Sequence, residues 1–137
     1  GMHFIMPVVK DGFIYGFAGR NPPDTELKCV NLATGEVVWT KDYFWKKDGQ
    51  IEGLFRGSIL QAGDRYIALG EDGILVELEL TPKGTNVLQR TRLFTAREAW
   101  TMPSLHKGLL YVVQNTVDSN DRKPRRIICY DLRGEKE

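Results

Sequence analysis

Few side chains in the chain are of the types that carry catalysis or bind metals. The two histidines, His3 and His106, each stand alone, without a second ligand or a nucleophile at a useful spacing. The two cysteines, Cys29 and Cys129, are too few for a disulfide framework and lack the CxxC spacing of a zinc site. We interpret the histidines as making ordinary polar contacts and the cysteines as free buried thiols. The sequence therefore predicts no catalytic or metal-ligating residue.

The segment DSNDRKPRR at 118–126 offers chemistry of two kinds. Its acidic part could supply oxygen ligands to a cation, and its basic part could hold an anionic ligand; the residues are Asp118, Asn120 and Asp121, then Arg122, Lys123, Arg125 and Arg126. The segment lacks the glycine and the bidentate glutamate of an EF-hand loop, and no aromatic residue interrupts the basic run. A solvated hairpin tip is the preferred interpretation.

Length, charge and hydropathy favour a single folded domain over residues 1–137. The chain has 19 basic and 18 acidic side chains and a formal net charge of +1, so no global field points to nucleic acid or acidic lipid. The apolar run LLYVV at 109–113 is far shorter than a membrane-spanning helix. The N-terminus lacks a charged n-region, so no signal peptide is predicted in this chain.

Strand signals dominate the sequence. Short β-branched and aromatic runs are bounded by Gly, Asp, Asn and Pro, as in FIYGF at 13–17, RYIALG at 65–70 and RIICYDL at 126–132. In ILVELEL at 74–80, apolar residues alternate with Glu77 and Glu79, which is the period of a half-buried strand. The one candidate helix, at 93–100, has no convincing apolar stripe. We therefore predict an all-β fold.

Three segments align without gaps, namely 7–17, 58–68 and 103–113. The alignment superposes three glycines and three tyrosines: Gly12, Gly63 and Gly108, and Tyr15, Tyr66 and Tyr111. Each glycine lies between two apolar runs, where a tight hairpin needs a positive φ. Ser58 and Ser104 also recur, as residues at strand edges without a partner histidine. The spacing is that of blade-sized β repeats.

The later parts of the three units also align when loops of different length are allowed. A third strand ends in a leucine in each unit, and a glycine follows; these residues are Leu32, Leu80 and Leu132, then Gly35, Gly84 and Gly134. A fourth strand follows in the first two units, with Trp39 in one and Leu88 at about the same place in the other. The units are predicted at 6–44, 57–95 and 101–134, with an insert at 45–56, and the last unit lacks its outer strand.

The run CVNLATGEVVW at 29–39 resembles the blade repeat of pyrroloquinoline quinone (PQQ)-like β-propellers, and the chain from Pro7 to Leu132 is similar to the C-terminal part of BamB-like proteins. The resemblance implies about three antiparallel four-stranded blades of a partial propeller. It also implies that Gly35 closes the turn into an outer strand and that Trp39 docks this strand against the next blade. Trp45 and Trp100 fall in linking positions, where packing roles are expected.

The resemblance implies a non-catalytic module for protein interaction or scaffolding, in a periplasmic or extracellular location. The alternatives are a fragment of a quinoprotein oxidoreductase that uses PQQ with calcium, and a truncated reading frame with no independent function. No set of residues for PQQ or calcium can be placed in the sequence. Because blades bury their faces only against neighbours, we expect self-association into a dimer or trimer through the open blade edges. The loops 18–26 and 118–126 are expected to share one surface.

Overall fold

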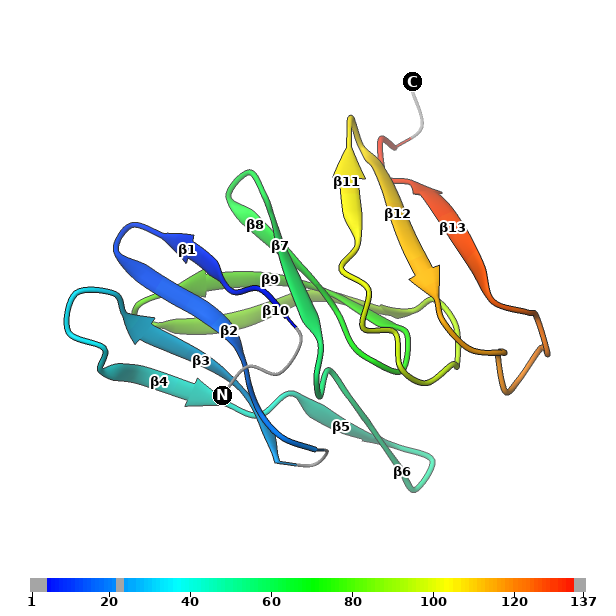
Figure 1. The fold of residues 1–137 in the computed structure, drawn as a ribbon, viewed down its shortest axis with the longest axis horizontal. Coiled ribbons are helices and arrows are strands. Elements are labelled where there is room, and N and C mark those ends of the chain that lie inside the picture. The colour runs from blue at the N-terminus through cyan, green and yellow to red at the C-terminus, as the bar shows by residue number, and fades with distance from the viewer. Residues whose placement is uncertain (1–4, 22–23, 135–137) are drawn as a thin grey trace.

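Every regular element in the computed structural model, which describes residues 5–21 and 24–134, is a β-strand (Figure 1). The first sheet contains β1 (Val8–Lys10), β2 (Phe13–Gly19), β3 (Thr25–Asn31) and β4 (Val37–Lys41). The second contains β7 (Ser58–Ala62), β8 (Arg65–Leu69), β9 (Ile74–Thr81) and β10 (Gly84–Arg92). The third contains β11 (Ser104–His106), β12 (Leu109–Gln114) and β13 (Arg126–Asp131). A separate hairpin is formed by β5 (Phe44–Lys47) and β6 (Gln50–Gly53).

The all-β prediction is confirmed, and two of the sheets are four-stranded, antiparallel and ordered as in the sequence. None of the described residues forms a helix, so a helix able to cross a membrane is not found among them. The segment 93–100 connects the second sheet to the third without regular structure. The insert at 45–56 is more than a link, because most of it belongs to the β5–β6 hairpin.

The turns that open the three sheets each contain one of the aligned glycines with a positive φ. Gly12 and Gly108, with φ of 82° and 77°, occupy the second position of two-residue turns. Gly63, with φ of 63°, occupies the first position of its turn, because Ala62 pairs with Arg65. The glycines therefore serve the same kind of hairpin from two different turn positions.

This difference corrects the gapless alignment by one residue in the second unit. Counted from the turn, Ile67 and not Tyr66 corresponds to Tyr15 and Tyr111. Side chains alternate between the two faces of a strand, so a slip of one residue moves a side chain to the opposite face. Tyr66 accordingly lies on the other face of its sheet from the one that Tyr15 and Tyr111 occupy in theirs.

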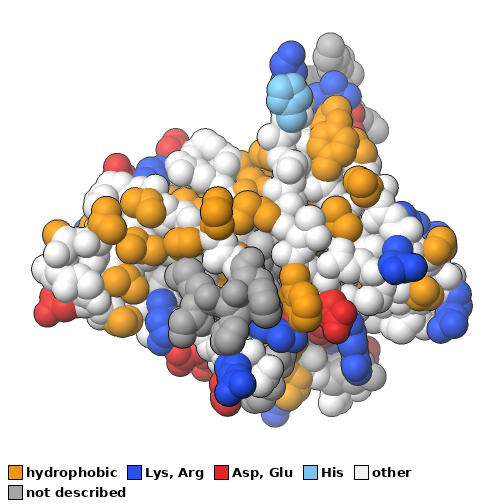
Figure 2. Space-filling view, viewed as in Figure 1, with side chains coloured by type: hydrophobic (Ala, Val, Ile, Leu, Met, Phe, Trp, Pro, Cys, Tyr) orange, Lys and Arg blue, Asp and Glu red, His pale blue; other side chains and the backbone are white. Residues whose placement is uncertain are grey.

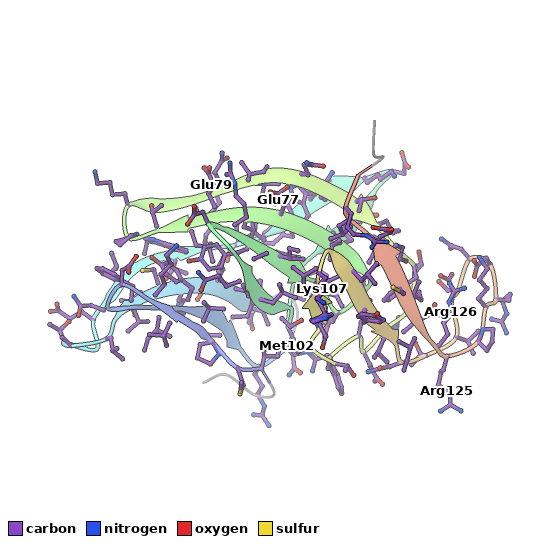
Figure 3. All side chains as sticks on the ribbon, turned by 90° about the horizontal axis from the view of Figure 1, so that it is seen from above. Glu77, Glu79, Met102, Lys107, Arg125 and Arg126 are labelled. Carbon is purple, nitrogen blue, oxygen red and sulfur yellow. The ribbon has the colours of Figure 1, made fainter. Side chains whose placement is uncertain are left out.

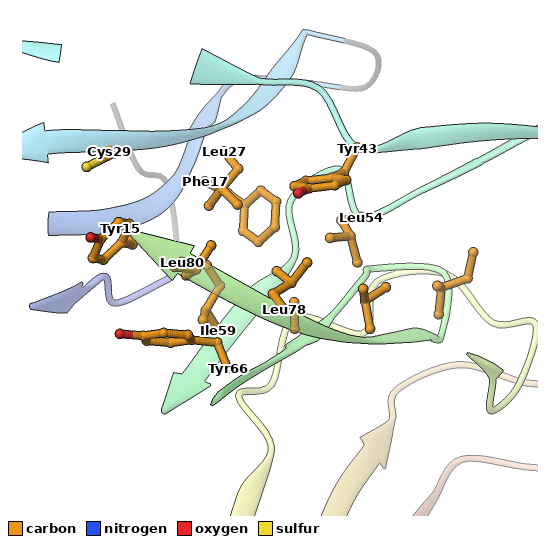
Figure 4. Packing of buried hydrophobic residues seen from close by; sticks show 13 residues of the cluster. Tyr15, Phe17, Leu27, Cys29, Tyr43, Leu54, Ile59, Tyr66, Leu78 and Leu80 are labelled. Atoms are coloured by element: carbon orange, nitrogen blue, oxygen red, sulfur yellow. The ribbon is translucent and has the colours of Figure 1, made fainter. Parts of the chain in front are cut away.

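With the corrected register, all three sheets stack in the same orientation. We call the face that carries Tyr15, Ile67 or Tyr111 the leading face of its sheet, and the opposite one the trailing face. The leading face of the first sheet packs on the trailing face of the second, where the rings of Tyr15 and Tyr66 lie 6.1 Å apart between centroids (Figure 4). The leading face of the second sheet packs on the trailing face of the third, through Leu69 and Leu110.

The second sheet is therefore covered on both sides. Its buried side chains alternate along β9, where Val76 and Leu78 belong to the core shared with the first sheet. Leu75 on the opposite face belongs to the core shared with the third sheet. The first and third sheets have one covered face each within the described part of the chain.

The two cysteines occupy different environments. Cys29 lies on the leading face of the first sheet and is buried, as predicted. Cys129 is exposed, which contradicts the prediction of two buried thiols. It pairs with Tyr111 on the leading face of the third sheet, and none of the described residues covers that face.

The corrected register predicts opposite outcomes for two tyrosines that the gapless alignment treats as equivalent. Tyr66 is only 1% exposed and Tyr111 is 39% exposed. Replacement of Tyr66 by alanine is expected to lower the free energy of unfolding by about 3 kcal/mol or more, because it leaves a cavity between two sheets. Tyr111→Ala should change it by about 0.5 kcal/mol or less in dilute protein. Urea unfolding followed by circular dichroism measures both, and equal effects would contradict the corrected register.

Candidate functional site

Trp39 lies where the first and second sheets meet. Its indole Nε1–H donates a hydrogen bond of 2.8 Å to the carbonyl oxygen of Thr81, the last residue of β9. Its ring centroid lies 6.0 Å from that of Tyr15. The outer strand of the first sheet is thereby attached to the neighbouring sheet.

The turn that precedes Trp39 is organised by an asparagine side chain. Asn31 Oδ1 accepts hydrogen bonds from the backbone N–H groups of Ala33 and Thr34, at 2.9 and 3.2 Å. Gly35 has φ of 74° and donates to the carbonyl oxygen of Asn31. In the third unit, Asp131 Oδ1 likewise accepts from the backbone N–H of Arg133, at 3.0 Å. The Asn-Leu and Asp-Leu pairs of the repeat therefore mark side-chain-capped turns.

The three leucines of the repeat occupy equivalent places with different degrees of cover. Leu80 lies within β9 and is buried between the first two sheets. Leu32 and Leu132 each follow directly after the last residue of a strand and are exposed. Both donate a backbone hydrogen bond to the carbonyl oxygen of the turn glycine, Gly12 in one unit and Gly108 in the other.

The glycines after these leucines differ in their geometry. Gly134 has φ of 74°, close to the value at Gly35. Gly84 has φ of 151° and belongs to β10, where it pairs with Thr81 across a two-residue turn.

The other two tryptophans pack against arginines. The guanidinium of Arg90 lies over the ring of Trp45 at 4.3 Å from its centroid, and this contact joins the β5–β6 hairpin to the second sheet. The guanidinium of Arg56 lies 4.8 Å from the ring centroid of Trp100. Both are cation–π contacts between segments distant in sequence.

The remaining chemically reactive residues are not brought together. His106 ends β11 and is exposed, and His3 lies outside the described residues. Ser58 begins β7 and is buried, and its hydroxyl is one of three buried side-chain oxygens without a partner among the described residues. Ser104 begins β11 and is exposed, so the two serines do not share an environment.

Asp118 uses its carboxylate to hold the β12–β13 loop in place. Oδ2 accepts from the backbone N–H of Thr95 at 2.9 Å, and Oδ1 accepts from those of Asn120 and Asp121 at 2.8 and 3.2 Å. The backbone hydrogen bond from Thr95 is the main cause that lowers the pKa of Asp118. Its oxygens are thus engaged by N–H donors, and the arrangement supports the hairpin interpretation over a cation site. Arg126 begins β13 and Arg125 directly precedes it, and both lie away from Glu77 and Glu79 (Figure 3).

The same loop depends on Gln114, which the sequence analysis did not single out. Its side chain is fully buried, and Nε2 donates to the carbonyl oxygens of Thr116 and Lys123 at 2.9 and 3.1 Å. Its Oε1 accepts from Arg126 Nε at 3.0 Å. A buried amide with both ends satisfied fixes the path of this loop. The sequence signal for this buried amide was a Gln placed directly after the apolar residues of the run LLYVVQ.

A second polar group that the sequence analysis missed surrounds Glu71, in the turn between β8 and β9. Glu71 is buried, and its Oε2 accepts hydrogen bonds from Arg56 Nε at 2.8 Å and Trp100 Nε1 at 2.9 Å. Burial raises the pKa of the adjacent Asp72, and the Glu71 carboxylate contributes to the rise. A buried carboxylate paired in this way connects the β6–β7 link, the second sheet and the segment before β11.

Asp72 faces a cavity of about 520 Å³ at the end of the sheets where second strands turn into third strands. Its charged lining residues are Glu52, Asp72, Arg92, Arg97 and Glu98. Arg92 Nη2 pairs with Glu52 Oε1 at 2.6 Å, so part of this charge is already neutralised. No histidine or cysteine is among the described residues that line it.

The two loops that were expected to share one surface each connect the second strand of a sheet to the third. The connections β2–β3, β8–β9 and β12–β13 all lie at the lower side of the molecule in Figure 1. Residues 22 and 23 of the first loop lie outside the described part.

No family model matched the chain, and no curated protein matched it. The class to which the structure itself assigns the chain is an all-β protein of stacked antiparallel sheets.

The position of Asp118 predicts a pH-dependent contribution to stability. Because its pKa is lower in the folded state than the usual value near 3.9, the contribution is complete above that pH and is lost as the pH falls through the folded-state pKa. Asp118→Ala should lower the free energy of unfolding by about 1 kcal/mol at pH 7, because three part-buried backbone N–H groups lose the carboxylate that accepts their hydrogen bonds.

Urea unfolding at pH 7 and at pH 3 measures this effect, with the exposed carboxylate of Asp42 as control. The loss caused by Asp118→Ala should shrink at the lower pH, whereas Asp42→Ala should have little effect at either. A loss of equal size at both pH values would show that the carboxylate charge does not matter.

Proposed function

We propose that the chain is a non-catalytic, propeller-like repeat module that acts in protein interaction, and that it binds further copies of itself through its two open sheet faces. The observation that carries this proposal is the common orientation of the three sheets. A leading face packs on a trailing face twice within the chain, and one face of each kind is left over at the two ends of the stack.

The leftover trailing face of the first sheet carries a row of β-branched residues. Val9, Ile14, Val30 and Val37 pair in succession across β1, β2, β3 and β4. Val9 and Val37 are each 54% exposed. Figure 2 shows hydrophobic side chains gathered over this part of the molecule. A contiguous apolar patch of this kind is typical of an interaction site.

The leftover leading face of the third sheet is also apolar. Ile127, which pairs with Val113, is 72% exposed, and Tyr111 lies beside it on the same face. Within the described residues, no fourth strand pairs with β13, so its outer backbone groups are open to another chain. Both the face and the edge therefore favour a partner that is itself a sheet.

A second copy is the partner whose surface fits best. Its trailing face would meet the leading face of the third sheet in the way that two such faces already meet inside the chain. Such a head-to-tail contact uses two different surfaces, and it closes into a small ring when the rotation between copies permits. We accordingly propose a dimer or trimer, with the loops at the β12–β13 end free for other proteins.

Paired variants test this arrangement. Ile127→Asp and Val9→Asp each place a charge on one of the two faces, and each variant alone should be monomeric by size-exclusion chromatography with light scattering. Mixed in equal amounts, they should form a dimer, because each still has one intact face. Val117→Asp is the control, since Val117 is similarly exposed but lies in the β12–β13 loop.

A wild-type chain that stays monomeric on concentration would contradict self-association. Failure of the mixture to form a dimer would contradict the head-to-tail arrangement in particular. Turnover in dye-linked alcohol oxidation after addition of PQQ and Ca²⁺ would instead support the quinoprotein alternative.

A further inference from the structure

The outer strands of the first two sheets carry a β-bulge at the same place. The register of β3 with β4 shifts after Cys29, and that of β9 with β10 shifts next to Glu77, its equivalent. Val38 and Leu88 are the bulged residues, so the counterpart of Trp39 is Gln89. Leu88, which the sequence alignment placed there, is one position away.

The two leading faces can therefore be compared residue by residue. In the first sheet one cross-strand row consists of Val8, Tyr15, Cys29 and Trp39. In the second sheet the corresponding row consists of Leu60, Ile67, Glu77 and Gln89. Two aromatic rings are replaced by smaller side chains, and a carboxylate takes the place of a thiol. Tyr15 and Trp39 fill the space between the first two sheets. The equivalent space between the second and third sheets is not filled by aromatic side chains from this row.

A cavity of about 590 Å³ occupies this place, which lies within the size range of small-molecule sites. Ile67, Leu75, Leu105 and Leu132 supply apolar walls, and Glu77 and Gln89 supply polar groups. Leu132 is 47% exposed, whereas its equivalent Leu80, next to the residue that binds the Trp39 indole, is 6% exposed. The third sheet thus presents an apolar surface at this position that no aromatic ring of the second sheet covers.

The charged residues that line the cavity are Arg65, Glu77 and Arg90. Arg65 forms an ion pair with Glu79, and Arg90 stacks on Trp45. Glu77 is half-buried and has no ion-pair partner among the described residues. A positively charged group placed in the cavity would find the Glu77 carboxylate without displacing an arginine.

We infer that this cavity binds a planar aromatic amine of about the size of an indole, with the ring in the place that Trp39 occupies in the first sheet and the ammonium group on Glu77. The site uses neither of the two open faces, so it is independent of the proposed self-association. A ligand held there contacts the second and third sheets together and joins them as Trp39 joins the first and second.

Isothermal titration calorimetry with three related probes tests the inference. Tryptamine should bind most tightly, indole less so, and indole-3-acetate about tenfold more weakly than tryptamine, because only the first offers a cation to Glu77. Glu77→Gln should remove most of the difference between tryptamine and indole-3-acetate while indole binding remains. Methyl resonances of Ile67 and Leu132 should shift with tryptamine in NMR spectra.

A variant that fills the cavity serves as the second test. Gln89→Trp should abolish binding of all three probes, because it restores the ring that the first sheet has at this position. Lys83→Trp, in the exposed β9–β10 turn, adds the same side chain elsewhere and should bind as the wild type does. If Gln89→Trp does not fold, Gln89→Phe takes its place.

Absence of binding by every probe at millimolar concentration would overturn the inference. So would unchanged binding in the folded filled variant, or equal affinity of the wild type for tryptamine and indole-3-acetate.

Discussion

Each sheet has two apolar faces that must be covered, and the rest of the structure depends on this requirement. Strands that are buried on both sides must find a neighbour on each, and the second sheet does so because a leading face fits a trailing face. Leu78 and Leu69, on opposite faces of that sheet, are both fully buried. The orientation of the stack, the docking of Trp39 and the two uncovered end faces all follow from this one pairing. Architecture of this kind constrains function without specifying a reaction.

Much of the fold could be predicted from local patterns. Alternation in ILVELEL gave a strand with two different faces, and the Asn-Leu and Asp-Leu turns gave the correct alignment of the third strands, because an Asx side chain fixes the turn that follows. The second unit was misaligned by one residue because a glycine is tolerated at either position of its turn. The β5–β6 hairpin was missed although Asp48-Gly49, with φ of 49° and 76°, is among the strongest short hairpin signals.

The polar sites were much less predictable. Asp118 was noticed for its oxygen atoms, but its partner Thr95 lies in a segment that has no regular structure and no distinctive spacing from it. The group of Arg56, Glu71 and Trp100 joins three segments whose proximity arises only when the sheets are stacked. Gln89 is the counterpart of Trp39 only because β4 and β10 have a bulge at the same place. Each of these depends on tertiary register, which a single sequence does not encode in its local pattern.

The one-sided cover of the third sheet has a consequence for the order in which the molecule opens. Among the described residues, its hydrophobic contacts reach the second sheet and the segment at 93–100, and a further contact is the hydrogen bond from the Thr95 N–H to Asp118. Loss of these contacts would release β11 to β13 as a unit while the core between the first and second sheets stays intact, since Tyr15, Leu27 and Leu78 have no part in them. We therefore expect the third sheet, which carries the exposed Cys129, to open before the larger core between the first and second sheets does.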